Sequence, residues 1–478
     1  MRKQTISALA GAAVIALGAV AAAPLAMAEA PQAAESSSGD RYVLRGRGGS
    51  LPAGLASAVA ARGAVLEQAF PQIGVAIVRA DESFAAANLR GIEAIVPDQA
   101  FELAQPPRFV EFEAAEKVDS IADGEPFYFL QWAPGAVQAP EAWNAGYTGA
   151  GVRVAVLDGG LYAAHADLAA NVDVAASRSF VPGFDFNQDT GTFWHGTHVA
   201  GIVGAPANGV GVVGIAPSST LIGVKVLHAG SGAFSQVIEG IMYAAMPVAQ
   251  GGAGAQVINM SLGAVIPSGH GNEDPGLKAA VRELVKAIDD ATTYAWNQGV
   301  TVIAAAGNAA INFDEEKDVL SIPSSNARVI SVAATGPFGW AYGDTSFARQ
   351  ASYTNSGKSA VSMAAPGGDF AWPTNEACTV INSAGTIGVS LPCWAFDMYL
   401  STSRGNTPAG AYSWAAGTSM ASPVVAGVAA LIIEKAGGRI SPALVEQRLM
   451  QGAQDLGKPG NDEVYGRGWV NAYESVQR

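Results

Sequence analysis

Three short blocks of the sequence contain a hydroxyl, an imidazole and a carboxylate among small residues. Ser419 lies in "AAGTSMASP", His195 opens "HGTHVAG", and Asp158 ends the apolar run "VRVAVLD". A serine hydroxyl is a weak nucleophile near neutral pH and becomes reactive when a neighbouring base takes its proton. An imidazole can act as that base, and a partly buried carboxylate needs a hydrogen-bond partner such as the imidazole. The three blocks predict nucleophilic catalysis, provided that the fold brings them together.

Each residue alone also has a structural interpretation. Ser419 could satisfy backbone groups at the start of a helix, and Asp158 could cap one. His195 and His198 are three residues apart, which is a metal-ligand spacing, but the glutamate and four-residue spacing of "HExxH" are missing and no third ligand stands out. We therefore expect no zinc site and treat His198 as a packed helix residue.

The elements that must position these residues follow from apolar runs. The runs are continuous rather than alternating, as in strands that are buried on both faces. A helical pattern covers 277–296, where apolar residues recur on one face. Strands that alternate with helices predict an α/β fold with three layers and a parallel central sheet, whose chemistry gathers at the carboxyl ends of the strands. The predicted strands are 152–158, 221–227, 257–263, 300–307 and 329–334.

These blocks also resemble a known family. "VAVLDGG", "HGTHVAG" and "GTSMASP", in that order, resemble the signature blocks of the subtilisin-like serine proteases, the subtilase or peptidase S8 family. "NMSLG", "AAAGN", "ASYTNSG", "MAAPGG" and "YGRGWVNAYESV" resemble further landmarks of that family. The resemblance covers residues 127–478 and implies a subtilisin-like catalytic domain there.

The resemblance implies a role for each catalytic residue. Ser419 would attack the peptide carbonyl, His195 would take and return its proton, and Asp158 would orient the imidazole. The side-chain amide of Asn308 and the backbone N–H of Ser419 would form the oxyanion hole. The enzyme would be a serine endopeptidase that works through an acyl-enzyme and requires no cofactor for catalysis.

The resemblance also implies where substrate binds. Two segments would line the cleft: the first would pair with the substrate backbone as an added strand, and the second would face it across the first specificity pocket. The two segments consist of Ser261, Leu262 and Gly263, and of Ala305, Ala306 and Gly307.

Several positions depart from the compact members of the family. Gly159 stands where the family has a hydroxyl residue, which removes a local hydrogen bond and leaves the carboxylate of Asp158. The segments 264–294 and 368–414 are longer, and the second could form part of the rim of the cleft. Substrate choice stays open between a broad degrading protease and a dedicated processing protease. A peptide-binding pseudoprotease is the non-enzymatic alternative.

A structural calcium ion is a further expectation from the resemblance. Asp167 and the loop "PANGVGV", which contains Asn208, match in part a site that stabilises members of the family. Their oxygen ligands suit calcium. The alternative is a helix-capping aspartate followed by an ordinary glycine turn.

The first 126 residues predict export and a removable pro-domain. Residues 1–28 have a positive start, an apolar run and an "AMA" cleavage site, as in a secretory signal peptide, although a membrane anchor is the alternative. A linker at 29–40 precedes a small α+β unit at 41–104, which resembles the inhibitory pro-domain of these proteases. Its helix is expected after a cap at Ser50, with Pro52 just inside. Residues 105–126 are expected as a connector, with self-cleavage between Gln99 and Pro126.

Composition narrows the partners. The chain has 41 acidic and 27 basic residues, a net charge of −14, which argues against a nucleic-acid-binding face. We expect protein or peptide substrates, inhibition by the chain's own pro-domain, and no membrane association after signal cleavage, since no later segment looks suited to crossing a bilayer. Cys378 and Cys393 could be two buried thiols, but export favours a disulfide and a secreted protein.

Overall fold

The structure is a computed structural model that describes residues 41–102, 108–113, 124–268 and 275–478. The predicted signal peptide and linker, and parts of the predicted connector, lie outside the described residues.

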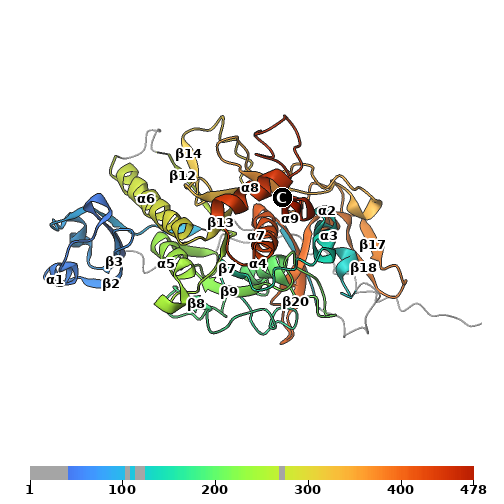
Figure 1. Ribbon diagram of the computed structural model, residues 1–478, viewed down its shortest axis with the longest axis horizontal. Coiled ribbons are helices and arrows are strands. Elements are labelled where there is room, and N and C mark those ends of the chain that lie inside the picture. The colour runs from blue at the N-terminus through green and yellow to red at the C-terminus, as the bar shows by residue number, and fades with distance from the viewer. Residues whose placement is uncertain (1–40, 103–107, 114–123, 269–274) are drawn as a thin grey trace, which may run out of the picture.

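Residues 127–478, which the resemblance predicts to be the catalytic domain and which are called the catalytic region below, are built on one parallel sheet of seven strands (Figure 1). Its five long predicted strands are all present, with ends that differ by a few residues, and every recorded pair among its strands is parallel. The predicted fold class is therefore confirmed. In spatial order the strands are β16 (Met363–Pro366), β15 (Val329–Thr335), β13 (Thr301–Ala305), β11 (Val257–Met260), β7 (Arg153–Asp158), β9 (Thr220–Lys225) and β8 (Arg178–Ser179).

Helices cover both faces of this sheet. Alternate side chains of β7 enter two different cores: Val154 and Val156 pack with α4 and α7, whereas Ala155 and Leu157 pack with α5 and α6. Successive strand residues point to opposite faces, so a continuous apolar run serves both layers. The four helices are α4 (His195–Gly204), α7 (Thr418–Lys435), α5 (Phe234–Ala245) and α6 (Pro275–Asn297).

Shorter elements complete the catalytic region. Helices α2 and α3 precede the sheet, and α8 and α9 follow α7 (Figure 1). The strands β12 and β14 form an antiparallel pair, and so do β19 and β20. Their bounds are α2 (Ala133–Ala136), α3 (Ala139–Asn144), α8 (Pro442–Gly452), α9 (Ala472–Gln477), β12 (Ala264–Pro267), β14 (Val319–Ile322), β19 (Tyr399–Ser403) and β20 (Ala411–Ala416).

The expectation that no later segment is suited to crossing a bilayer is wrong for one apolar helix. Among the described residues, α7 is long and apolar enough to cross a bilayer, but 89% of its apolar window is buried inside the protein. It is the central helix of the core rather than an exposed one.

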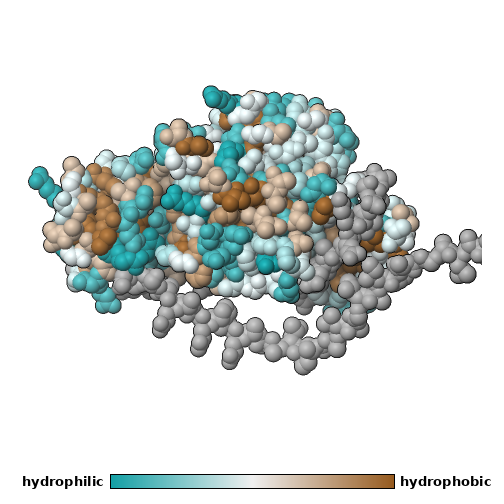
Figure 2. Space-filling model, turned by 90° about the horizontal axis from the view of Figure 1, so that it is seen from below, coloured by the Kyte–Doolittle hydropathy of each residue, from teal (hydrophilic) through white to brown (hydrophobic). Residues whose placement is uncertain are grey.

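On the face shown in Figure 2, hydrophobic residues form several patches among hydrophilic ones, as is common on globular proteins.

The N-terminal unit is an antiparallel sheet with the strand order β2-β3-β1-β4, and it packs on α5 and α6 (Figure 1). Its strands are β1 (Arg41–Gly46), β2 (Val65–Phe70), β3 (Val75–Arg79) and β4 (Ile92–Pro97). The expected helix capped by Ser50 is wrong in its start. Helix α1 spans only Leu55–Ala60, because Gly54 adopts a left-handed conformation (φ 75°) and turns the chain just before it.

Two buried arginines of β1 join this unit to the catalytic region. Arg45, of which 3% is exposed, binds Glu283 at 2.8 Å and Asp290 at 3.0 Å, both on α6. Arg41 binds Glu239 on α5 at 3.1 Å. Buried arginine–carboxylate pairs are strongly destabilised when one partner is removed, so these contacts tie the orientation of the unit to the two helices.

The predicted connector is not a plain linker, because it contains a strand. Strand β6 (Arg108–Glu113) pairs with β20 along six residues, from Ala416 opposite Arg108 to Ala411 opposite Glu113. Just before it, β5 (Ala100–Glu102) pairs antiparallel with β10 (Ser231–Ala233). The segment between the N-terminal unit and the catalytic region is therefore held by two strand pairs, β5 with β10 and β6 with β20.

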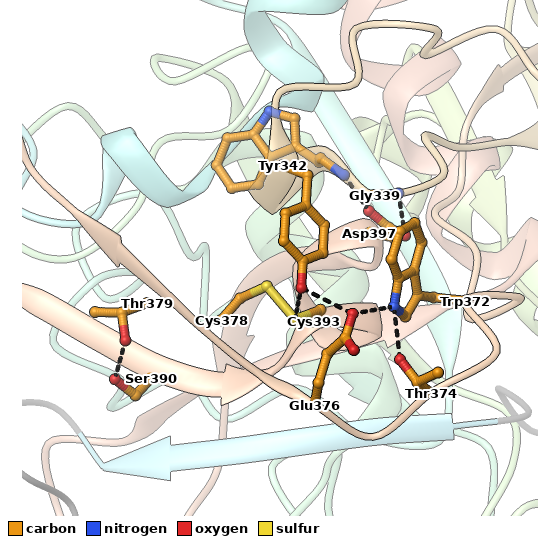
Figure 3. The surroundings of a disulfide bond; sticks show 11 residues. Gly339, Tyr342, Trp372, Thr374, Glu376, Cys378, Thr379, Ser390, Cys393 and Asp397 are labelled. Carbon is orange, nitrogen blue, oxygen red and sulfur yellow. Dashed lines mark hydrogen bonds between the residues drawn. A yellow bond between two sulfur atoms is a disulfide. The ribbon is translucent and has the colours of Figure 1, made fainter.

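The longer segment before Ser419 forms a hairpin that carries the disulfide (Figure 3). Strands β17 (Ala377–Ile381) and β18 (Gly388–Pro392) pair antiparallel, and Cys378 is bonded to Cys393. The Tyr342 hydroxyl lies 3.5 Å from the sulfur of Cys393 and donates to Glu376 at 2.8 Å. The predicted disulfide thus joins the two ends of the hairpin.

Candidate active site

The carboxylate of Asp158 and the imidazole of His195 form a buried pair. Asp158 ends β7 and His195 begins α4, and only 2% and 4% of these residues are exposed. Nδ1 of His195 lies 2.9 Å from Oδ2 and 3.0 Å from Oδ1 of Asp158. The carboxylate also accepts the N–H of Gly159 at 2.6 Å. This geometry places the proton of the imidazole on Nδ1 and directs Nε2 away from the carboxylate.

Glycines allow this pair to approach so closely. A Cβ on Gly196 would lie 2.5 Å from the carbonyl oxygen of Gly160 and 2.9 Å from Cβ of Asp158. A Cβ on Gly159 would lie 2.6 Å from a carboxylate oxygen of Asp189. The small residues of the "HGTHVAG" block therefore let the start of α4 press against the end of β7, as the sequence indicates.

Ser419 lies in the first turn of α7, and 2% of it is exposed. Its hydroxyl donates to the carbonyl oxygen of Ser261 at 3.1 Å, whereas Nε2 of His195 is buried without a hydrogen-bond partner. The expected hydrogen bond between the serine and the imidazole is thus not present in this structure. A hydroxyl rotates readily, and catalytic hydrogen bonds often form only when substrate is bound.

A network of hydroxyl groups fixes the backbone around Ser419. The hydroxyl of Ser261 donates to the carbonyl oxygen of Ser419 at 2.7 Å and lies 2.9 Å from the hydroxyl of Ser422. The side-chain amide of Asn259 donates to the Ser261 hydroxyl at 2.9 Å. Because all four residues are buried, this network holds the end of β11 against the start of α7.

Asn308 is oriented by the residue that precedes the nucleophile. Its Oδ1 accepts the N–H of Thr418 at 2.9 Å and the hydroxyl of Thr418 at 2.8 Å, so its Nδ2 points elsewhere. Nδ2 of Asn308 and the backbone nitrogen of Ser419 lie 3.5 Å and 3.6 Å from the point where a Cβ on Gly417 would stand. The missing side chain at Gly417 keeps open a space bordered by both donors, which is the arrangement that an oxyanion needs.

The two predicted substrate-binding segments lie side by side beyond the paired strands β11 and β13. A Cβ on Gly263 would stand 3.2 Å from the carbonyl oxygen of Ile322 and 4.0 Å from that of Ala305, so the two segments lie close together. The side chain of Leu262 is buried, and the carbonyl of Ala306 accepts hydrogen bonds from Ser321 and Asn355. The neighbouring Gly307 donates its N–H to the Thr418 hydroxyl at 3.0 Å.

A buried lysine beside Asp158 escaped the sequence analysis. Lys225 is the register partner of Asp158 on the neighbouring strand β9, and 1% of it is exposed. Its ammonium donates to the carbonyl oxygens of Gly159 and, at 2.7 Å, Leu227. Burial lowers the pKa of Lys225 to about 8, against the opposing effect of Asp189 and Asp158. The signal was available, because a lysine inside the apolar run "LIGVKVL" must find polar partners.

Asp167 and Asn208 also come together, with a third residue that sequence analysis missed. Asp167 accepts the N–H of Val212 at 2.8 Å, and Glu125 accepts that of Gly209 at 2.8 Å. One oxygen of each carboxylate, Oδ1 of Asp167 and Oε2 of Glu125, is buried without a hydrogen-bond partner. Burial raises the pKa of Asp167 well above its usual value, and the charge of Glu125 raises it further.

His198 is a packed residue. Its Nε2 lies 2.9 Å from the carbonyl oxygen of Ser413 on β20, and its ring is wholly buried. Burial, with a smaller contribution from the neighbouring His195, lowers the pKa of His198 to about 3. Among the described residues, no three His, Cys, Asp or Glu side chains gather to hold a metal ion.

This neutral histidine should make the protein sensitive to acid. A pKa below the unfolded value of about 6.5 means that the unfolded state binds the extra proton, so stability falls as the pH drops below about 6.5 and the loss reaches about 3 kcal/mol by pH 4. In His198→Gln, whose amide can still donate to Ser413, the unfolding free energy should fall less over this range. Denaturant unfolding of the Ser419→Ala and Ser419→Ala/His198→Gln proteins from pH 7 to pH 4 measures this difference. An equal fall of the unfolding free energy in both proteins would contradict the prediction.

Comparisons with known proteins agree with this arrangement. Residues 149–468 match the Subtilase family, and the chain is 33% identical over 377 residues to the M-protease of Shouchella clausii (strain KSM-K16). That alignment covers 79% of this chain and 76% of the relative.

Two solved structures share the fold. One is a lanthipeptide protease, with a TM-score of 0.58 and 27% identity, over 74% of this chain and 96% of that chain. The other is the epidermin leader peptide processing serine protease from Staphylococcus aureus, with a TM-score of 0.68 and 23% identity, over 92% of this chain and 98% of that chain. The chain belongs to the subtilase family of serine proteases.

Proposed function

We propose that this protein is a secreted serine endopeptidase that hydrolyses peptide bonds with Asp158, His195 and Ser419 and is made as a pro-enzyme. The observation that carries the proposal is the buried Asp158–His195 pair, together with the Asn308 amide and the Ser419 N–H that both border Gly417. The apolar N-terminal run and the Cys378–Cys393 disulfide support export.

The reaction follows from these groups. The oxygen of Ser419 attacks the peptide carbonyl while Nε2 of His195 takes its proton, and Asp158 balances the positive imidazolium. The negative oxygen of the tetrahedral intermediate receives hydrogen bonds from Asn308 and from the N–H of Ser419. His195 then gives its proton to the departing amine, which leaves an acyl-enzyme. Water, activated by the same imidazole, attacks the ester and releases Ser419.

The proposed pro-domain is supported by how the chain enters the catalytic region. The N-terminal sheet is held on α5 and α6 by Arg41 and Arg45, and β5 adds to β10 in the way that an extended peptide adds to an exposed strand. The short span from β5 to β6 then includes the bond that the enzyme would cut in itself.

The residue types between β5 and β6 limit which peptide bond can be the cleaved one. Two of the bonds have Pro106 or Pro107 on their C-terminal side, so their departing nitrogen belongs to a proline ring. A cut after Pro107 would place a residue without an N–H next to the scissile carbonyl, where an added strand needs donors. We therefore propose that the cut follows Leu103 or Ala104, whose apolar side chains suit a pocket lined by small residues.

N-terminal sequencing tests the proposal. Wild-type protein purified after expression should begin at Ala104 or Gln105, and Ser419→Ala should retain the N-terminal unit. Peptides spanning 98–113 should be cleaved at the same bond by the mature enzyme. Equal trimming of wild type and Ser419→Ala, without added protease, would overturn self-processing. Absence of peptide cleavage by the wild type would overturn the enzymatic function.

A dedicated processing protease is the second candidate function. It is favoured by the similarity to the lanthipeptide protease, at 27% identity over 74% of this chain, and by the extended pairing of the chain before and after the proposed cut. A mixed peptide pool separates the two: a processing enzyme cuts few sequences, whereas a degrading enzyme cuts many.

We also propose a structural calcium ion between Asp167, Glu125 and Asn208. The two buried carboxylate oxygens without partners fit a hard cation, which would relieve the repulsion between the two charges. Asn208 and backbone carbonyl groups of its loop would supply further oxygens. The ion would stabilise the loop and take no part in the reaction.

Calcium removal should lower stability. Saturation at about 1,000 times Kd would contribute about 4 kcal/mol, so chelation should lower Tm by roughly 5–10 °C. We expect this change in Ser419→Ala protein, which avoids self-digestion, and a much smaller one in Ser419→Ala/Asp167→Asn. Differential scanning fluorimetry with and without chelator measures it. An unchanged Tm in the Ser419→Ala protein would contradict the calcium site.

A further inference from the structure

Strands β5 and β6 flank the short span of the chain that contains the proposed cut. Strand β5 ends at Glu102 on β10, and β6 begins at Arg108 opposite Ala416, three residues before Ser419. The six Cα–Cα steps from Glu102 to Arg108 span at most about 21 Å. Because the cut proposed above falls within these steps, β6 is the stretch that follows the cleaved bond.

The pairing of β6 is backbone pairing with a rigid strand. Strand β20 is the middle strand of the order β19-β20-β6, and all six of its residues are buried. Trp414 and Tyr412 hold it in the core, with 0% and 2% exposed. Since β19 supports β20 from its other side, β20 would keep its shape when β6 is removed.

Removal of β6 would leave β20 as an edge strand. Its unpaired N–H and C=O groups would then form a template to which another extended chain can add. This template runs from Ala416, three residues before Ser419, back to Ala411.

We propose that β20 is a binding strand for the residues that follow the cleaved bond of a substrate, and that β6 occupies it until it detaches. This inference rests on the proposed endopeptidase function. If the cut follows Ala104, residues 105–113 are the nine residues after it, so the preferred substrates are extended chains with about nine residues beyond the cut. Backbone pairing makes this preference one of length and extended shape.

Peptides of different lengths test the proposal. One series keeps residues 98–104 before the cut and continues with three, six or nine residues of this chain after it. With fully processed enzyme, kcat/KM should rise about tenfold or more from three to nine residues, since each added backbone hydrogen bond contributes a few-fold. Equal rates for all lengths would overturn the inference and leave the endopeptidase function standing. Cleavage of none would refute the function itself.

N-methylated peptides provide a matched control. In an antiparallel pair, alternate residues direct their N–H groups to the partner strand and the others direct them away. Two peptides carry N-methyl groups on the two alternate sets of amides among the last six residues. One set should abolish the rise in kcat/KM, and the other should preserve it. An equal loss with both sets would contradict pairing with β20.

A variant of the chain checks the occupancy by β6. Replacement of residues 108–113 by glycine and serine should weaken the pairing and leave Ser419 and the N-terminal unit unchanged. Immediately after self-cleavage, this variant should hydrolyse the nine-residue peptide several-fold faster than wild type and the three-residue peptide at the same rate. Equal rates of wild type and variant on the longer peptide would overturn the proposal that β6 occupies the site.

Discussion

Ser419→Ala should reduce kcat for peptide hydrolysis by about 10⁶, a magnitude that comes from subtilisin, the namesake of this family. Without the hydroxyl no acyl-enzyme forms, and only the binding of substrate and of the oxyanion remains. His195→Ala should lose about as much, because the imidazole and the hydroxyl act as one unit. The double variant should be no worse than either single one. Initial rates with a fluorogenic peptide measure all three.

Ser475→Ala is the matched control for this experiment. Ser475 is also a buried serine, but it lies on α9 and its hydroxyl has no hydrogen-bond partner. Its loss should leave kcat within about twofold. A Ser419→Ala protein that retains more than about a hundredth of the wild-type kcat would show that another residue is the nucleophile.

Asn308→Leu should lower kcat by about 10²–10³ and change KM little, a range that was measured for the oxyanion asparagine of subtilisin. The amide would bind the developing oxyanion more strongly than the neutral carbonyl, so its loss affects the transition state and not the bound substrate. Leucine has a similar size and cannot donate a hydrogen bond. Steady-state kinetics of this variant separate kcat from KM.

Thr418→Val examines the same hole indirectly. Thr418 donates its hydroxyl to Asn308 and accepts the N–H of Gly307, so it positions the amide without reaching substrate. Its removal should cost less in kcat than the loss of Asn308, and the Asn308→Leu/Thr418→Val protein should be no slower than Asn308→Leu alone. Additive losses would mean that Thr418 acts independently of the amide.

The central sheet could be predicted because its strands are buried on both faces. Runs such as that of β7 are continuously apolar, which marks them without knowledge of their partners. The Asp158–His195 contact could be anticipated in the same way. Small residues in "HGTHVAG" indicate a close approach, and Gly196 indeed has room for no side chain. Local sequence carries both signals.

Strands β5 and β6 could not be predicted, because their partners lie far away in the sequence. Strand β6, "RFVEFE", pairs with residues about 300 positions later, and β5 pairs with β10 more than 100 positions later. Short strands with charged residues show no pattern that separates them from a linker. Their pairing depends on edges that only the folded catalytic region provides.

The rotation of single side chains was also beyond the sequence. The Ser419 hydroxyl binds the carbonyl oxygen of Ser261 rather than His195, and both acceptors are compatible with the same backbone. Glu125 gives no local signal either. It approaches Asp167 because Phe127, two positions later, packs against Tyr412 and donates its backbone N–H to the carbonyl oxygen of Gly211.

Labelling with a fluorophosphonate tests the central claim most directly, because this reagent reacts much faster with an activated serine oxygen than with an ordinary hydroxyl. Mature wild-type protein should carry one phosphonyl group, and peptide mapping by mass spectrometry should place it on Ser419. His195→Ala protein should be labelled at least about a thousandfold more slowly. A group on another residue, or equal labelling of both proteins, would contradict the assignment of Ser419 as a nucleophile activated by His195.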